Sequence, residues 1–306
     1  MARDFRRTAG AMMVTLSLLL AGSGRVQAQA PLARYRAYSV RTPDGLAIAA
    51  QDWGNPSGPG ILFIHGFAQS HLSFAKQTGS GLAGEFHMVT YDLRGHGSSD
   101  KPLEPENYKS AKLWGDELQA VIETTGLKRP VLVGWSYAGR VIIDYLTTHG
   151  QDGIAGLVLV DATTKTGPAF NGPGIKNLGQ MTSEDLATNI DATRAFIHVC
   201  FAKQPTPDEF ETMLAFNMMV PTKVRAALGG RPLDADAVLK QLTLPVLVIH
   251  GTEDQMLRID MAKYTAAAIP GAKLSIYEGV GHASFWEDAP RFNRELAEFV
   301  RATQKP

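Results

Sequence analysis

Cysteine is almost absent from this 306-residue sequence, which contains only Cys200. One thiol cannot close a disulfide within the chain, so a packed hydrophobic core must hold the fold together. The hydrophobic content of 44% is enough for a sizeable core, in one large domain or two ordinary ones. Cys200 stands among Phe196, Ile197, Val199 and Phe201, and this setting predicts a buried, unreactive thiol.

An excess of charge of either sign is also lacking. Thirty Lys and Arg residues balance thirty Asp and Glu residues, and without residues 1–30 the chain keeps 26 basic against 29 acidic residues. A nucleic-acid partner needs a basic surface, so none is expected. The histidines His65, His96 and His282 fall on separate predicted loops without a metal-ligand spacing, and no G-x-G-x-x-G follows a predicted strand. Neither a metal nor another cofactor is therefore expected.

Residues 1–30 differ from the rest of the chain and predict a secretory signal peptide. Three arginines precede an uncharged run over residues 8–24, and small residues follow it. The run is too short to span a bilayer comfortably, although an uncleaved membrane anchor is the alternative. Cleavage is expected after Ala28 or after Ala30, and Pro31 makes the second site the poorer one. We therefore expect a secreted or periplasmic protein without stable membrane insertion.

Apolar runs of strand length alternate with helical segments and predict a mostly parallel α/β sheet with helices on both faces. Eight strands are expected, at residues 36–41, 46–52, 60–64, 86–91, 131–133, 156–160, 245–250 and 273–277. The first two are expected to form an antiparallel hairpin at one edge. Ligands of such sheets bind beyond the carboxyl ends of the strands, where residues 65–67, Ser136 and Asp161 are expected.

Residues 162–240 interrupt this alternation and predict an inserted helical lid. Glycine and proline break the segment 166–174, and helical spacing follows over residues 187–201 and 208–219, with no run typical of a strand. Residues 31–161 and 241–306 are then the two parts of the α/β core.

The segment around Ser136 predicts a strand, a sharp turn and a helix. Residues 131–133 are a continuous apolar run typical of a strand buried on both faces, and residues 137–149 have helical spacing. Gly134 lets the strand and the helix pass close together, so Ser136 can adopt a strained conformation that exposes its hydroxyl.

A serine hydroxyl is a weak nucleophile until a base takes its proton, and the base needs a third group to orient it. The chain supplies candidates in the order Ser136, Asp254 and His282, and the last two each follow a predicted strand on a short, glycine-bearing loop. Asp161 is the alternative acid, because it also ends a strand at the same edge.

Five motifs together resemble those of lidded α/β-hydrolases, nearest to the cofactor-free haloperoxidase and esterase branch. They are HGF at 65–67, YDLRGHGSSD at 91–100, GWSYAG at 134–139, LPVLVIHGTED at 244–254 and GVGHASFWEDAP at 279–290. The resemblance covers essentially the whole mature chain except the lid. It departs from the usual G-x-S-x-G at Ala138, with a glycine only at Gly139.

This resemblance implies the α/β-hydrolase fold and a role for each matching residue. Ser136 resembles the nucleophile, His282 the general base and then acid, and Asp254 the carboxylate that orients the histidine. The backbone N–H groups of Phe67 and Tyr137 resemble the oxyanion hole.

Serine at the turn points to acyl transfer to water, whereas haloalkane dehalogenases and epoxide hydrolases carry aspartate there. Trp135, Met213 and Met218 are expected to line an apolar pocket, which suits small, largely apolar carboxylic esters as substrates. A lactonase, a C–C bond hydrolase and a perhydrolase or haloperoxidase-type activity are alternatives with the same three residues. A non-catalytic binding protein on a hydrolase scaffold is the alternative of another class, and the sequence indicates no oligomeric state.

Overall fold

The computed structural model describes residues 35–231 and 233–303 of the chain. The predicted signal peptide and both of its cleavage sites lie outside the described residues.

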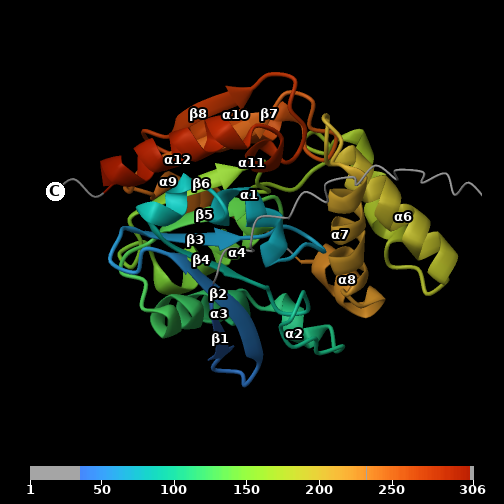
Figure 1. The fold of residues 1–306 in the computed structure, drawn as a ribbon. Helices are drawn as coiled ribbons and strands as arrows, with labels where there is room; N and C mark the ends of the chain where they lie inside the picture. Colours follow the sequence, from blue (N-terminus) through green and yellow to red (C-terminus); the bar gives the residue numbers. More distant parts are fainter. Residues whose placement is uncertain (1–34, 232, 304–306) are drawn as a thin grey trace, which may run out of the picture. The chain divides into compact units, whose positions relative to one another are not determined.

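An eight-stranded sheet forms the centre of the described part of the chain (Figure 1). Its strands are β1 Arg36–Arg41, β2 Ala47–Gly54, β3 Gly60–Ile64, β4 His87–Tyr91, β5 Val131–Trp135, β6 Gly156–Val160, β7 Val246–Gly251 and β8 Lys273–Tyr277. They are arranged in the order β1-β2-β4-β3-β5-β6-β7-β8. The pairs β1–β2 and β2–β4 are antiparallel and the other pairs are parallel, so the predicted mostly parallel sheet is confirmed.

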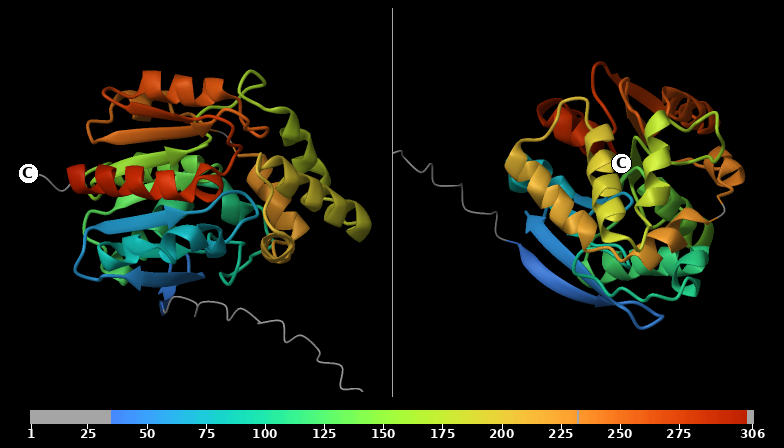
Figure 2. Two further views of the ribbon diagram at one scale, coloured as in Figure 1. Left: turned by 45° about the horizontal axis from the view of Figure 1, so that its top comes forward. Right: turned by 90° about the vertical axis from the view of Figure 1, so that its right-hand side faces the viewer.

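Strands β3 to β7 are buried at every position, because helices cover both faces of the sheet. The helices are α1 Ala75–Thr78, α2 Glu106–Lys109, α3 Ala111–Thr125, α4 Ala138–His149, α5 Asn177–Gln180, α6 Leu186–Val199, α7 Pro207–Met218, α8 Thr222–Gly229, α9 Asp236–Lys240, α10 Ile259–Ala268, α11 Ser284–Glu287 and α12 Ala289–Thr303. Helices α3, α4, α9 and α10 pack on one face, and α1, α11 and α12 pack on the other (Figures 1 and 2).

Helices α5 to α8, which we call the lid helices, stand between β6 and β7 in the range where a lid is predicted. They project to one side of the sheet, and α6 packs against both α5 and α7 (Figure 1). Helix α9 lies in the same predicted range but packs on α4 and α10 of the core. The last part of the range 162–240 therefore belongs structurally with the helices of the sheet.

Two helical segments differ from the sequence-based expectation. The helical spacing of residues 108–125 predicts one continuous helix, but α3 begins only at Ala111, because Ser110 has extended backbone angles (φ −81°, ψ 131°) and separates α2 from α3. Helix α8 was not predicted, since Val224 and Leu228 are the only large apolar side chains among its eight residues. Short helices of this kind carry too little periodicity to be recognised.

Cys200 is buried and free, as its apolar neighbours predict. Burial raises the pKa of its thiol well above the ordinary value, so the side chain is a packing residue.

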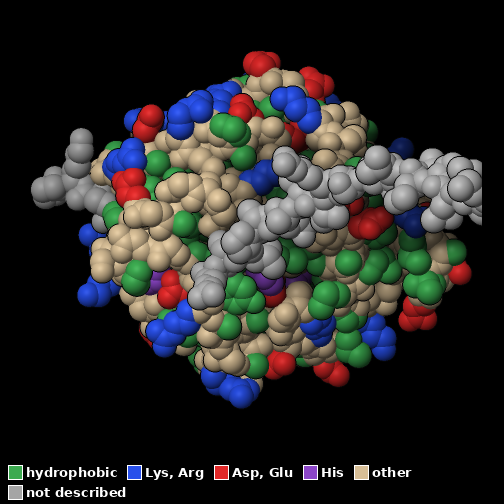
Figure 3. Space-filling view, in the orientation of Figure 1, with side chains coloured by type: hydrophobic (Ala, Val, Ile, Leu, Met, Phe, Trp, Pro, Cys, Tyr) green, Lys and Arg blue, Asp and Glu red, His purple; other side chains and the backbone are tan. Residues whose placement is uncertain are grey.

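On the face shown in Figure 3, acidic and basic side chains are interspersed. Among the described residues, no helix combines the length and the apolar character that crossing a membrane requires.

Candidate active site

Ser136 occupies the turn between β5 and α4 in a backbone conformation that few side chains adopt. Its φ is 57°, in the left-handed region, which costs on the order of 1 kcal/mol for a residue other than glycine. Two backbone hydrogen bonds hold the turn: the N–H of Ser136 donates to the carbonyl of Val160 (3.0 Å), and the N–H of Thr163 donates to the carbonyl of Ser136 (2.9 Å). The end of β6 therefore fixes the serine at the edge of the sheet.

The small residues of the turn are required by close neighbours. A Cβ at Gly134 would lie 2.4 Å from Cδ1 of Ile142, and a Cβ at Gly139 would lie 2.6 Å from the carbonyl oxygen of Thr163. Ala138, in contrast, is buried with its methyl group in the core. The departure from G-x-S-x-G at Ala138 leaves the turn intact, because the closest backbone crossing is at Gly139.

The structure brings the imidazole of His282 between Ser136 and Asp254. Its Nε2 lies 2.8 Å from the Ser136 hydroxyl oxygen, and its Nδ1 lies 2.7 Å from one carboxylate oxygen of Asp254. The other oxygen of Asp254 accepts hydrogen bonds from the N–H groups of Met256 (2.7 Å) and Leu257 (2.9 Å), which fix the carboxylate. With its proton on Nδ1, the imidazole presents the lone pair of Nε2 to the serine hydroxyl.

The pKa and the backbone of His282 are also set by its surroundings. Burial lowers the pKa of His282, but the charge and the hydrogen bond of Asp254 outweigh burial and raise this pKa above its ordinary value. The backbone N–H of His282 donates to the carbonyl of Cys200 (2.9 Å), and its carbonyl accepts from the indole N–H of Trp135 (2.6 Å). The ring is therefore a strengthened base in a fixed position.

Asp161, the alternative acid, lies behind this group and makes no hydrogen bond to His282. It accepts from the N–H of Gly251 (2.9 Å) and the hydroxyl of Ser284 (3.0 Å), and burial raises its pKa. His250 separates the two carboxylates, with Nδ1 3.4 Å from Asp161 and Nε2 3.5 Å from Asp254. The geometry therefore favours Asp254 over Asp161 as the partner of His282.

Asp161, His250 and Asp254 offer ligand atoms within 4.8 Å of one another, close enough for a metal site. However, the two ring nitrogens of His250 face different carboxylates, and both oxygens of Asp254 are engaged by His282 and by backbone N–H groups. A cation would displace the hydrogen bonds that align His282. These residues fit a hydrogen-bonded network better than a metal site.

The backbone N–H groups of Phe67 and Tyr137 lie next to the serine turn. Within residues 35–231 and 233–303, neither donates a hydrogen bond to another protein atom. Gly66 permits the close approach of the Phe67 loop, since a Cβ there would lie 3.0 Å from the Cβ of Ser136. Two donors without partners beside the Ser136 hydroxyl can bind a negatively charged oxygen.

Two buried histidines hold the Phe67 loop in place. His65 donates to the carbonyl of Gly66 (2.9 Å) through Nδ1 and accepts from the N–H of Leu93 (3.0 Å) through Nε2. His96 accepts from the N–H of Ala68 (3.2 Å). Burial lowers the pKa of His65 to about 4 and that of His96 to about 3, so both stay neutral and can accept these bonds near pH 7.

Comparison with known proteins agrees with this geometry. A family model described as alpha/beta hydrolase fold matches residues 59–289 of the chain. The chain belongs to the alpha/beta hydrolase family.

Relatives of this hydrolase match it over almost their whole length. The crystal structure of a putative aryl esterase from Burkholderia cenocepacia is 36% identical, with a TM-score of 0.85, over 88% of this chain and 99% of that chain. An esterase from Rhodococcus sp. ECU1013 is 32% identical, with a TM-score of 0.82 and the same coverage. A bifunctional esterase/perhydrolase from Acinetobacter calcoaceticus is 27% identical over 283 residues, 86% of this chain and 99% of that protein.

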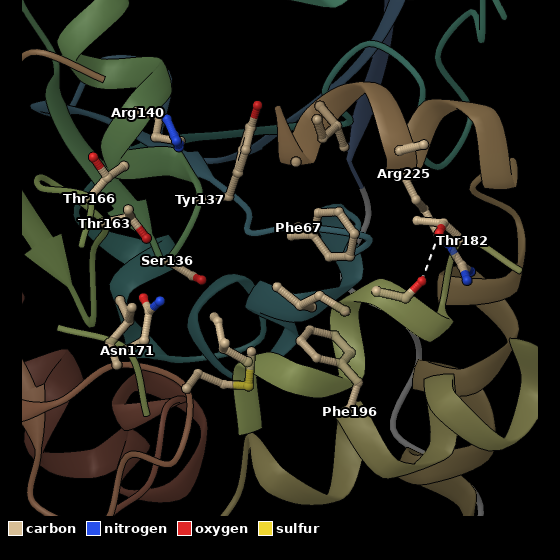
Figure 4. Close-up of a pocket in the computed structure, with 18 of the residues that line it drawn as sticks. Phe67, Ser136, Tyr137, Arg140, Thr163, Thr166, Asn171, Thr182, Phe196 and Arg225 are labelled. Atoms are coloured by element: carbon tan, nitrogen blue, oxygen red, sulfur yellow. Dashed lines mark hydrogen bonds between the residues drawn. The ribbon is translucent and has the colours of Figure 1, made fainter. Parts of the chain in front are cut away.

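The pocket of this hydrolase has a volume of about 510 Å³ and reaches Ser136 (Figure 4). Its apolar lining consists of Phe67, Ile175, Leu178, Phe196, Ala226, Leu228, Met256 and Leu257. Its polar and charged lining includes Thr163, Lys165, Thr166, Asn171, Thr182, Arg140 and Arg225. Residues of the core and of the lid helices therefore share the wall.

The predicted pocket residues Trp135, Met213 and Met218 do not line this pocket, so that prediction is corrected. Trp135 is buried, where its indole contacts the ring of Phe285 (centroids 4.9 Å apart) and donates to His282. Met213 is buried within the lid helices, and the sulfur of Met218 lies 4.0 Å from the guanidinium of Arg225. The apolar face of α7 thus serves the internal core of the lid helices.

Several residues of the pocket are not among those predicted from the sequence. Thr163 comes two residues after Asp161, and its position beyond the end of β6 was a usable signal. Asn171 lies in a segment that glycine and proline break, and nothing in the neighbouring sequence marks it as a pocket residue.

Proposed function

We propose that this hydrolase is a serine esterase that cleaves small carboxylic esters with a largely apolar part. The observation that carries the proposal is the bridging imidazole of His282, 2.8 Å from Ser136 and 2.7 Å from Asp254. The names of the esterases that this chain resembles support the same class of reaction. The apolar lining of the pocket suits the apolar part of such a substrate.

In the first half of the proposed reaction, the hydroxyl oxygen of Ser136 attacks the ester carbonyl carbon while Nε2 of His282 takes the hydroxyl proton. The oxyanion formed accepts hydrogen bonds from the N–H groups of Phe67 and Tyr137. The bond to the alcohol oxygen then breaks, and the imidazolium returns its proton to the departing alkoxide.

In the second half, a water molecule gives a proton to His282 and attacks the acyl group on Ser136. The second tetrahedral intermediate collapses, the carboxylic acid leaves, and the serine oxygen recovers its proton from the imidazolium. The balance is one ester and one water consumed, with one acid and one alcohol released.

A second candidate activity is perhydrolysis on the same acyl-enzyme. The relative from Acinetobacter calcoaceticus is named a bifunctional esterase/perhydrolase. In that reaction hydrogen peroxide replaces water as the acceptor, and the product is a peracid. Oxidation of a halide by the peracid then gives haloperoxidase-type activity without a cofactor.

Covalent labelling tests the proposed nucleophile. A fluorophosphonate probe should label the purified protein, and Ser136→Ala should abolish both labelling and hydrolysis of p-nitrophenyl butyrate. Equal labelling of Ser136→Ala and wild type would contradict the assignment, and labelling without turnover of any ester would favour the binding-protein alternative. Titration of peracid in the presence of hydrogen peroxide measures the second activity.

We also propose that the hydrolase is exported, on the basis of its charged, apolar and small N-terminal segments. Expression of the full chain followed by cell fractionation should place the enzyme in the periplasm or medium. The mature N-terminus should then follow Ala28 or Ala30, and an intact Met1 in the cytoplasm would contradict export.

A further inference from the structure

The pocket around Ser136 has two chemically different sides. Thr163 and Asn171 lie on one side of Ser136, whereas the rings of Phe67 and Phe196 lie on the other (Figure 4). A substrate whose carbonyl carbon meets Ser136 extends toward both sides. Its two ends therefore meet different chemistry.

On the polar side, the hydroxyl of Thr166 has no hydrogen-bond partner within the described part of the chain, but Thr166 is exposed. Two further neutral side chains there also have no partner in the described residues. They are the hydroxyl of Thr163 and the side-chain amide of Asn171, both of which are half-buried. The neighbouring ammonium of Lys165, in contrast, is bound by the carboxylate of Asp236 at 2.5 Å. Thr163 and Asn171 thus have hydrogen bonds to offer to a ligand.

The backbones of both residues are bonded to the segments that carry Ser136 and Asp254. The backbone N–H of Thr163 donates to the carbonyl of Ser136 (2.9 Å). Asn171 forms an isolated β-bridge with Leu257, whose N–H donates to Asp254 (2.9 Å). A ligand group bound by this pair lies close to the bond that is cleaved.

The charged side chains around the pocket determine which polar group of a substrate is favoured beside Thr163 and Asn171. Every charged side chain that lines the pocket in the described residues is basic: Arg140 on the Thr163 side, Lys165, which pairs with Asp236, and Arg225, which lies beyond Phe67 (Figure 4). Oxygen atoms that accept hydrogen bonds are favoured in such surroundings over ammonium groups. The Thr163 hydroxyl and the Asn171 amide N–H groups are the donors for such an oxygen.

We infer that the preferred substrate is a two-part ester, with an apolar portion on the Phe67 side and a second carbonyl-type oxygen on the Thr163 side. Oxo-acid esters, monoesters or diesters of short dicarboxylic acids, and esters of oxo-alcohols belong to this class. The inference rests on the proposed esterase function. A purely alkyl chain on the polar side displaces water from Thr163 and Asn171 and offers these side chains no hydrogen bond in return. The transition state of such an ester is therefore bound more weakly.

Matched pairs of esters test this inference. The first pair, p-nitrophenyl 4-oxopentanoate and p-nitrophenyl pentanoate, places the additional oxygen in the acyl part. The second pair, acetonyl acetate and isobutyl acetate, places it in the alcohol part. The wild type should show a ratio of kcat/KM, oxo over alkyl, of about ten or more in one of the two pairs.

Near-isosteric variants of Thr163 and Asn171, the proposed oxygen-binding subsite, test whether the ratio comes from this subsite or from the intrinsic reactivity of the esters. Thr163→Val and Asn171→Leu should each lower that ratio, and the double variant should bring it down about tenfold. Asn171→Asp, which replaces a donor by an acceptor carboxylate, should lower the ratio further than Asn171→Leu. Thr212→Val, at an exposed position on α7, is the control that should keep the wild-type ratio.

Thermal unfolding of each variant by circular dichroism verifies that the fold is kept. A ratio unchanged in the double variant for both pairs would overturn the subsite while leaving the esterase proposal standing. Failure of the wild type to hydrolyse any of the four esters would instead refute the proposed function itself.

Discussion

His282 receives each of its fixing contacts from a different segment of the chain. Asp254, after β7, holds its Nδ1; Trp135, at the end of β5, donates to its carbonyl; and Cys200, just after α6, accepts from its N–H. Loss of any one of these contacts leaves the other two in place. The carboxylate of Asp254 therefore contributes mainly the tautomer and the charge, and less the location of the ring.

The substitution Asp254→Asn should reduce kcat by roughly 10⁴-fold with little change in fold, because an amide can no longer hold the proton on Nδ1. Steady-state hydrolysis of p-nitrophenyl butyrate measures the effect.

Asp161→Asn is the matched control for this prediction. It should lower kcat by less than about tenfold, because Asp161 bonds to Gly251 and Ser284 and not to the imidazole. A larger loss from Asp161→Asn than from Asp254→Asn would transfer the role of the acid to Asp161.

The raised pKa of His282 predicts the acid side of the pH profile. The base works only when neutral, so kcat/KM should fall as the pH drops through a pKa above the ordinary value of 6.5. Asp254 raises this pKa, so in Asp254→Asn the residual activity should persist to lower pH. Profiles of kcat/KM between about pH 5 and 9 measure the acid limb of the wild type and of the variant. An acid limb at the same pH in both proteins would contradict this account.

Among single residues, those whose role follows from bonding chemistry were predictable. Ser136, Asp254 and His282 were named from residue type, order and strand ends, and the structure brings their side chains together. The pocket residues were not predictable, because a wall is defined by which helix face turns inward. Met213 and Trp135 are apolar in sequence but point into cores.

The lid helices are joined by one buried cation on α8, Arg225. Its guanidinium donates to the carbonyls of Met181 (3.0 Å) and Asn217 (2.5 Å) and to the side chains of Asn189 (2.8 Å) and Thr193 (3.2 Å). Burial lowers the pKa of Arg225 to about 10, and its bonded acceptors are all neutral. The connection among α6, α7 and α8 therefore depends on satisfied hydrogen bonds and not on an ion pair.

Arg225→Met should lower the free energy of unfolding by about 2–4 kcal/mol, because it leaves buried carbonyl groups without donors. It should also accelerate limited proteolysis within residues 181–229, which mass spectrometry of the fragments can locate.

Arg194→Met offers a control on α6. Arg194 forms a solvent-exposed ion pair with Asp191, with 3.6 Å between guanidinium nitrogen and carboxylate oxygen. Such pairs contribute little, so Arg194→Met should change the free energy of unfolding by no more than about 0.5 kcal/mol. Equal stability and equal cleavage of the two variants would contradict the role given to Arg225.

Helices and strands were predicted best where their pattern is long. Strands β3, β5, β6 and β7 contain continuous apolar runs, and α6 and α7 begin within one residue of the expected positions. Helix α8 was missed because tertiary contacts such as those of Arg225 stabilise it, and such contacts do not appear as a periodic pattern in the sequence. The break at Ser110 was missed because the apolar spacing of residues 108–125 continues across it.

The fold as a whole was predictable because parallel strands, right-handed crossovers and the rule for ligand sites restrict the arrangement of a chain with this alternation. The position of α9 was not predictable. Nothing in its sequence distinguishes a short helix of the lid from one that packs on α4 and α10.

The buried histidines make the stability of the whole molecule sensitive to acid. His65 and His96 remain neutral in the folded protein down to about pH 4 and about pH 3. In the unfolded chain, both take up protons near pH 6.5. The unfolded state therefore binds more protons below pH 6.5, and stability is lost as the pH falls toward these lowered values.

The expected loss is about 3 kcal/mol from His65 alone by pH 4. Urea unfolding between about pH 7 and 4 should show the decline. His96→Gln, less stable at pH 7, should show a shallower decline because one of the two titrations is gone. An identical slope in wild type and variant would show that other groups govern acid unfolding.

One hydrogen bond links the supply of substrate to the chemistry. The carbonyl that receives the N–H of His282 belongs to Cys200, directly after the helix that also places Phe196 in the pocket. A rigid-body tilt of α6 that widens the entrance would stretch this bond, and only the contacts of Asp254 and Trp135 would then hold His282. Opening the pocket through α6 therefore weakens one of the three contacts that fix His282, whereas a movement elsewhere in the wall leaves all three in place.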